Sequence, residues 1–216
     1  MTQVAIIGGH GKIALKLAKY LAERGDKVTS IIRNSAQSDD IAATGAEPLV
    51  ADVETLDTAS LASVLAGNDV VVWSAGAGGG DPTRTYAVDR DAAIRSMEAA
   101  QSAGVRRYVM VSYFGAGPDH GVPEDDSFYA YAQAKAEADE ALRKTPLDWT
   151  ILGPARLTDD EGTGRIAVGG DRSSSSEVSR DNVAQVAAAV IAAPTTVGKT
   201  IEFTDGEVPV DEAIAG

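Results

Sequence analysis

A glycine-rich turn close to the N-terminus constrains the fold more than any other feature of the sequence. The apolar run 4–7 stops at Gly8 and Gly9, and His10 and Gly11 lead into a segment with apolar side chains at helical spacing. Glycine permits a tight turn between a strand and a helix and lets a ligand approach the backbone. The helix N-terminus then presents free N–H groups and a partial positive charge. The turn predicts a strand–turn–helix unit that binds a nucleotide phosphate, and a purely structural turn is the alternative.

Short apolar runs alternate with helical patterns along the rest of the chain. The expected strands lie at residues 4–7, 27–32, 47–51, 69–73, 107–112, 148–152, 166–168 and 200–203, and the expected helices include 55–65, 83–103, 129–143 and 181–192. Most of these strands are apolar at nearly every position, which is typical of a parallel sheet buried between two layers of helices. The pattern predicts one doubly wound α/β domain over residues 1–216, a Rossmann fold with a small C-terminal extension on the substrate side.

Three segments are expected to be irregular. Residues 156–180 are rich in Gly, Ser and Asp and include the serine run 173–176, so we expect a loop around the short strand 166–168. Residues 115–127 contain glycines, prolines and acidic side chains, which predicts a mobile lid. The three glycines 78–80 are expected to form a flexible loop.

The composition argues against several classes of partner and site. Lysine and arginine number 19 against 32 acidic residues, and the formal charge of −13 argues against nucleic acid and anionic membranes. The chain has no cysteine and only His10 and His120, which predicts no metal site. Its apolar runs are far shorter than the roughly 20 residues that span a bilayer. We therefore expect a cytoplasmic protein, monomeric or homodimeric, that acts on a small molecule.

The residues after the second expected strand bear on which dinucleotide is bound. An Asp or Glu there would bind the adenosine ribose hydroxyls of NAD. This chain has Arg33 followed by Asn34, and a guanidinium suits the 2′-phosphate of NADP. Lys12, in the glycine-rich turn, adds positive charge. The predicted cofactor is NADP, with NAD less favoured, and a solvated arginine at the strand end is the alternative.

The ends of the third and fourth expected strands supply further candidates. Asp52 and Val53 fall beside the expected adenine, whose amine Asp52 can contact, and a loop or helix-capping role for Asp52 is the alternative. Small residues after the fourth strand leave room for the ribose. The cofactor site predicted in this half of the chain is Gly8, His10, Gly11, Lys12, Ile13, Arg33, Asn34, Asp52, Val53, Ser74, Ala75 and Gly76.

Tyr131 and Lys135 form a second motif. They are four residues apart on an expected helix and therefore share a face. A neighbouring ammonium favours the phenolate and lowers the pKa of a tyrosine, which suits acid–base catalysis. Ser112, at the end of the fifth strand, can donate to the same substrate oxygen or satisfy the backbone there. We predict Tyr131, Lys135 and Ser112 as catalytic residues, with Lys135 also holding the cofactor ribose.

The motifs of this chain resemble those of the atypical short-chain dehydrogenases/reductases, a group that includes NmrA-like and biliverdin/flavin reductase B-like proteins. The resemblance covers essentially the whole chain and rests on Gly8-x-x-Gly11-x-x-Ala14, Arg33, Asp52-Val53, Tyr131-x-x-x-Lys135 and Gly153-Pro154. It implies NAD(P) binding, with the backbone at Gly153, Pro154 and Ala155 facing the nicotinamide. The chain departs from the extended members because it lacks a large substrate domain.

These observations predict an NADP(H)-dependent oxidoreductase. Hydride moves between the nicotinamide and a small carbonyl, quinone or flavin-like acceptor, with Tyr131 as the proton donor. One alternative is a non-catalytic NADP-binding sensor of the NmrA-like type, although the presence of both Tyr131 and Lys135 favours the enzyme. A nucleotide-sugar epimerase or dehydratase is a further alternative, for which the chain is short.

Overall fold

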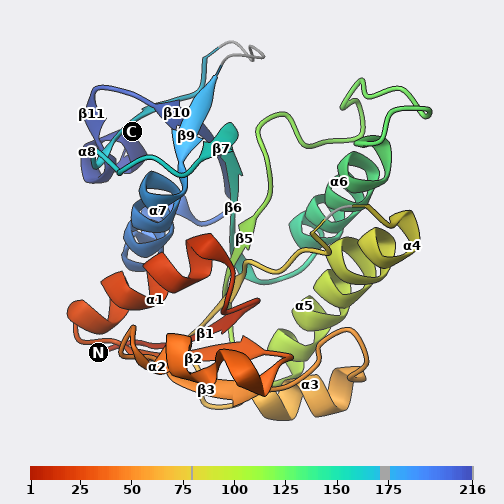
Figure 1. The fold of residues 1–216 in the computed structure, drawn as a ribbon, viewed down its shortest axis with the longest axis vertical. Helices are drawn as coiled ribbons and strands as arrows, with labels where there is room; N and C mark the ends of the chain where they lie inside the picture. The colour runs from red at the N-terminus through yellow and green to blue at the C-terminus, as the bar shows by residue number, and fades with distance from the viewer. Residues whose placement is uncertain (79, 171–175, 216) are drawn as a thin grey trace.

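A central sheet separates two layers of helices in the computed structural model, which describes residues 1–78, 80–170 and 176–215 (Figure 1). In these residues the sheet has nine strands, in the order β11-β8-β10-β6-β5-β4-β1-β2-β3. Strands β7 (Arg156–Thr158) and β9 (Glu177–Ser179) pair separately. The strands of the main sheet are β1 Gln3–Ile7, β2 Lys27–Ile32, β3 Glu47–Val50, β4 Val70–Trp73, β5 Arg107–Val111, β6 Asp148–Pro154, β8 Arg165–Val168, β10 Lys199–Asp205 and β11 Val208–Pro209.

The helices divide between the two faces of this sheet (Figure 1). One face is covered by α1 (Lys12–Glu23), α2 (Ser38–Ala42), α7 (Arg180–Ala192) and α8 (Val210–Ala215). The other is covered by α3 (Thr58–Leu65), α4 (Pro82–Thr85), η2 (Tyr86–Ala92), α5 (Ala93–Ser102) and α6 (Tyr129–Arg143). The described residues also include two single-turn 3₁₀ helices, η1 (Ser35–Gln37) and η3 (Pro194–Thr196). No helix in the described ranges is both long and apolar enough to cross a membrane.

Strand β1 shows why its residues are apolar without alternation. Val4 and Ile6 pack into the core beneath α1 and α7, whereas Ala5 and Ile7 pack into the core beneath α3 and α5. Consecutive side chains of a strand point to opposite faces, so a strand covered on both sides must be apolar at every position. All four side chains are fully buried.

The connectivity places a crevice at the carboxyl end of β1. Strand β1 pairs in parallel with both β2 and β4, so the chain winds outward to β3 on one side and to β5, β6 and β10 on the other. Ligands of such sheets bind where the winding direction reverses, outside the carboxyl ends of the strands. The predicted doubly wound α/β fold is confirmed. Strand β8 runs antiparallel to both of its neighbours, β10 and β11.

The prediction that residues 156–180 are mostly loop was wrong in part. Strands β7 and β9 occupy both ends of this segment, and β8 contains the one strand that was expected there. Three of the four side chains of β8 are exposed, so its sequence lacks the apolar run that marks a buried strand. Gly79 and residues 173–175, which were also expected to lie in loops, fall outside the described residues.

The helix expected at 83–103 is present, although its winding changes along its length. Residues Tyr86–Ala92 form a π-helical segment between α4 and α5. Such insertions into α-helices are frequent at functional sites. The expected lid 115–127 is irregular, and His120 links it to α6, because its Nε2 lies 3.3 Å from Gln133 Oε1.

Candidate functional site

The glycine-rich turn after β1 is shaped by contacts that tolerate no side chain. Gly8 has a φ of +83°, and a Cβ there would lie 2.5 Å from the Cα of Ala75. A Cβ on Gly9 would lie 2.6 Å from the Cβ of Ser30. The turn therefore packs between the ends of β2 and β4, and glycine is required at both positions for steric reasons.

The turn delivers the N-terminus of α1 to the crevice. Gly11 is the N-cap, so no side chain caps the helix, and the first turn has no acidic residue. Uncapped N–H groups and the helix dipole favour an anion at this point. The arrangement matches the pyrophosphate cradle of dinucleotide-binding folds.

A first cavity of about 290 Å³ opens beside this turn, along the ends of β1, β2, β3 and β4. Many of the predicted cofactor residues line it. Those that line it are Gly8, His10, Gly11, Arg33, Asp52, Val53, Ser74, Ala75 and Gly76. The glycine-rich turn, the uncapped N-terminus of α1 and this cavity together fit the adenosine and pyrophosphate part of a nicotinamide dinucleotide.

Five predicted cofactor residues line neither described cavity, and one of them, Lys135, is buried in the protein interior. The Lys12 ammonium reaches Asp159 Oδ2 at 2.5 Å, and the Ile13 side chain is buried in the core. Asn34 Oδ1 caps η1 by accepting from the Ala36 N–H. Gly153 lies within β6, where a Cβ would crowd Glu202. Sequence position did not show which way each of these side chains points.

The first cavity also contains residues that the sequence reasoning missed. The Glu54 carboxylate lies 3.5 Å from Arg84 Nε and 3.9 Å from Arg33 Nη1. Arg84 comes from α4 and also donates to the Ala77 carbonyl in the loop after β4. Asp52 Oδ1 accepts from the Glu54 N–H at 3.1 Å, as the loop interpretation of Asp52 requires. Two arginines and two carboxylates therefore share this end of the crevice.

A second cavity of about 510 Å³ lies beyond the ends of β5 and β6. Tyr131, Pro154 and Ala155 line it, together with Tyr113 and Phe128, which were not predicted. The ring centroids of Tyr113, Phe128 and Tyr131 lie 5.2–5.7 Å apart, so the three rings form one aromatic wall. This cavity can accept an apolar, planar molecule.

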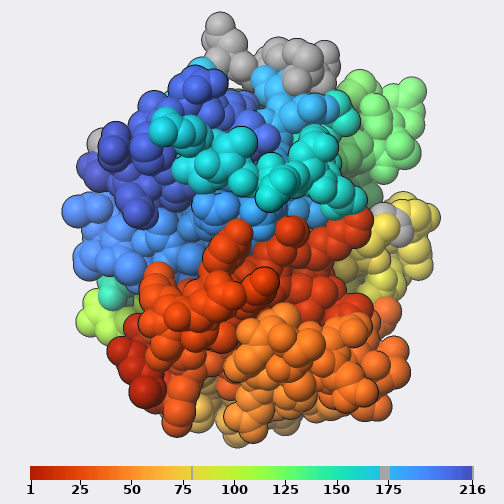
Figure 2. Space-filling model, turned by 60° about the vertical axis from the view of Figure 1, so that its left-hand side comes forward, coloured from red at the N-terminus to blue at the C-terminus, as the bar shows by residue number. Residues whose placement is uncertain are grey.

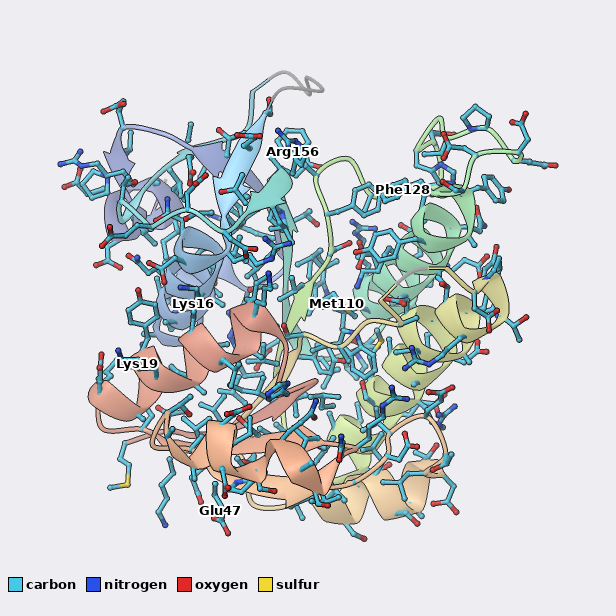
Figure 3. The ribbon with its side chains drawn as sticks, viewed as in Figure 1. Lys16, Lys19, Glu47, Met110, Phe128 and Arg156 are labelled. Carbon is cyan, nitrogen blue, oxygen red and sulfur yellow. The ribbon has the colours of Figure 1, made fainter. Side chains whose placement is uncertain are left out.

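Two arginines, Arg156 and Arg180, also line the second cavity. Arg156, in β7, and Phe128, just before α6, approach the second cavity from different sides of the molecule (Figure 3). Arg156 pairs with Glu177 of the neighbouring strand β9. Arg180 pairs with Asp159 at 2.8 Å, and Asp159 also binds Lys12 at the start of α1. Figure 2 shows the segment that follows β6, coloured cyan, packed against the red N-terminal segment.

Lys135 lies in a buried polar cluster and not in either cavity. It is 1% exposed, and its ammonium donates to the Val111 carbonyl at 2.8 Å. Ser112 is also buried and donates to Asp139 Oδ2 at 2.6 Å. Ser112 was expected to share a substrate oxygen with Tyr131, and Lys135 to face the cofactor cleft, but both bind groups beneath the cavity.

Two buried carboxylates accompany this lysine. Asp89, from η2, and Asp139, one turn after Lys135 on α6, are 1% and 0% exposed. Burial raises the pKa of both carboxyls, and the Lys135 ammonium opposes that shift. Burial lowers the pKa of Lys135, which both carboxylates oppose. Asp89 Oδ2 also accepts from the Ala77 N–H at 2.9 Å, so the cluster holds the loop after β4.

The cluster changes the expected electrostatics of Tyr131. The pKa of Tyr131 was expected to fall because of Lys135, and instead it is raised above its ordinary value of 10.0. Burial is the first cause, and the carboxylates of Asp89 and Asp139 add to it. Tyr131 is therefore a neutral phenol at physiological pH.

The sequence contained a signal for one of the missed carboxylates. Lys135 and Asp139 are four residues apart and share a helical face, as Tyr131 and Lys135 do. Asp89 carried no such signal, because it belongs to another helix and its contact with Ala77 spans 12 positions.

Replacement of Lys135 by Met should destabilise the protein strongly. It leaves two buried carboxylates without their cation, and removal of one partner from a buried charge pair typically costs about 3–5 kcal/mol. Denaturant unfolding at neutral pH measures the loss. Lys144→Met, on an exposed lysine just after the same helix, is the matched control and should change stability by less than about 1 kcal/mol. Equal losses in the two variants would contradict this account.

The comparisons with known proteins agree with this geometry. A model of the NAD(P)H-binding family matches residues 8–194. A UPF0659 protein of Schizosaccharomyces pombe is 35% identical over 235 residues, which cover 100% of this chain and 95% of the relative.

Two solved structures share the fold along their whole length. One, from Bacillus halodurans and named as an NAD-dependent epimerase/dehydratase, has a TM-score of 0.92 at 29% identity and covers 100% of this chain and 99% of that chain. The other, the oxidoreductase ylbE of Lactococcus lactis, has a TM-score of 0.87 at 27% identity and covers 99% and 95%. With the glycine turn, the uncapped α1 and the first cavity inside the matched region, the chain belongs to the NAD(P)H-binding family.

Proposed function

We propose that this protein is an NADP(H)-dependent oxidoreductase acting on a small carbonyl, quinone or flavin-like acceptor. The observation that carries the proposal is the pair of cavities along the carboxyl edge of the sheet. The glycine-rich turn lines the first cavity, and Tyr131 lines the second. A dinucleotide that enters with its adenosine in the first directs its nicotinamide toward the second.

Arg33 supports NADP as the preferred cofactor. Its guanidinium follows the end of β2 and lines the first cavity, where the adenosine ribose is expected. Arg84 lines the same cavity and adds a second cation. Guanidinium groups bind phosphate oxygens in a planar, two-point geometry.

The residues of the second cavity support acid catalysis of a reduction. The bound nicotinamide supplies the hydride, and the protein orients it and supplies the proton. Tyr131 keeps its phenolic proton at neutral pH because its pKa is raised, so it can donate to an oxygen or nitrogen that gains negative charge. The rings of Tyr113 and Phe128 pack beside it. Lys135 is a positioning residue, because its ammonium is bound to the Val111 carbonyl and joins α6 to the end of β5.

The aromatic wall favours a conjugated acceptor among the proposed classes. Three neighbouring rings give a planar quinone or flavin-like molecule a surface for stacking. NADPH oxidation measured across a panel of quinones, flavins and aldehydes tests the proposal. Turnover with any acceptor supports it, and binding of NADPH without turnover of any of them contradicts it.

One observation favours a second candidate, an NADP-binding sensor without catalysis. Lys135 is withdrawn from the crevice into a buried cluster, whereas a catalytic pair needs the ammonium near the phenol. The acceptor panel separates the two functions, because a sensor binds NADPH with the same preference and oxidises none of it.

Arg33→Ala should remove most of the preference for NADPH over NADH. A lost hydrogen bond to a charged group costs about 1.5–3 kcal/mol, and NADH lacks the phosphate that makes it. Calorimetric titration of both cofactors measures the change. Arg106→Ala, an exposed arginine outside both cavities, is the matched control. Equal wild-type affinities for the two cofactors would contradict the proposed preference.

Tyr131→Phe should lower kcat by about 10²–10⁴, the usual contribution of a general acid, while NADPH binding changes little. Tyr129→Phe, on the same helix but outside the cavity, is the matched control and should keep full activity. Because the pKa of Tyr131 is raised, kcat of the wild type should not fall through ionisation of this phenol below pH 10.0. Unchanged turnover in Tyr131→Phe would reject the acid role and leave the cofactor assignment intact.

A further inference from the structure

Two arginines share one carboxylate at the adenosine end of the first cavity. Glu54 lies 3.5 Å from Arg84 Nε and 3.9 Å from Arg33 Nη1, and all three side chains line the cavity. The Glu54 side chain is 28% exposed and that of Arg84 is 32% exposed, so this contact is not a freely solvated surface pair. Arg33 is more open, at 58%.

The backbone around Glu54 is held firmly. Asp52 Oδ1 accepts from the Glu54 N–H, and Arg95 donates to the Glu54 carbonyl at 3.1 Å. Arg84 is held in turn through the Ala77 carbonyl. The carboxyl group of Glu54 is therefore the part of this arrangement that can move without disturbing the loop.

We propose that Glu54 is a specificity-determining residue, one that occupies in the free protein the position between Arg33 and Arg84 that the 2′-phosphate of NADP(H) takes on binding. The inference rests on the proposed NADP(H) function and assigns Arg84 as a second phosphate ligand. A phosphate monoester carries more negative charge than a carboxylate and offers three oxygens to two guanidinium groups. It therefore displaces the carboxylate, whereas the uncharged ribose hydroxyls of NAD(H) do not.

This competition has a consequence for cofactor choice. Glu54 keeps the two arginines in place without a ligand, but it also opposes the phosphate by charge repulsion and by competing for the same donors. Glu54 thus limits the preference for NADP(H) that Arg33 and Arg84 create. Removing its charge should strengthen binding of a 2′-phosphate and leave ligands without one unaffected.

Calorimetric titration with adenosine 2′,5′-bisphosphate and adenosine 5′-monophosphate tests this directly, because the two probes differ only in the 2′-phosphate. Glu54→Gln should tighten the bisphosphate about threefold to fivefold, the scale of a partly exposed charge interaction, and change the monophosphate less than twofold. Arg84→Gln should weaken the bisphosphate about tenfold relative to the monophosphate. Glu54→Ala, which removes the side chain, should act like Glu54→Gln.

The matched control is Glu47→Gln, because Glu47 is exposed at the opposite end of β3 and its replacement makes the same change in net charge. It should alter neither probe by more than about twofold. Unchanged or weaker binding of the bisphosphate to Glu54→Gln overturns the inference, and so does an equal change for both probes. Equal binding of the two probes to the wild type would instead reject the proposed NADP preference, and the shift caused by Glu54→Gln is read independently of it.

Discussion

The close packing of the Gly8 backbone against Ala75 is the contact on which the rest of the structure depends. It joins the ends of β1 and β4, where the Ser74 N–H donates to the Ile7 carbonyl at 2.9 Å. A side chain at Gly8 would push these ends apart and turn α1 away from the crevice. This contact keeps β1 beside β4 where the strand order reverses. It therefore also directs the uncapped N-terminus of α1 toward the crevice, where such folds bind ligand phosphates.

The charges of the site are balanced locally within a strongly acidic chain of net charge −13. Arg33 and Arg84 share Glu54, Arg156 pairs with Glu177, and Arg180 pairs with Asp159. Each acid holds its arginine in place. An anionic ligand at either cavity would have to compete with a carboxylate for the same guanidinium.

The fold was predictable from local patterns, but the orientation of the site residues was not. Apolar strands followed by helical spacing indicated the parallel sheet, and the bounds of α6 matched the prediction at both ends. Spacing placed Tyr131 and Lys135 on one helical face, but α6 turns that face toward both the cavity and the core. Lys135 interacts with Asp89 only through tertiary packing. The sequence alone does not show whether an aspartate is buried or exposed.

The most direct test of the account is an amide chemical-shift titration of the protein with NADPH. The central claim is that the pyrophosphate binds at the N-terminus of α1, within the glycine-rich turn. The largest shifts should therefore fall on the amides of residues 8–14 and on Ser74 to Ala77 at the end of β4. Saturable binding that leaves residues 8–14 unshifted, with the largest changes on another helix terminus such as that of α7, would contradict it.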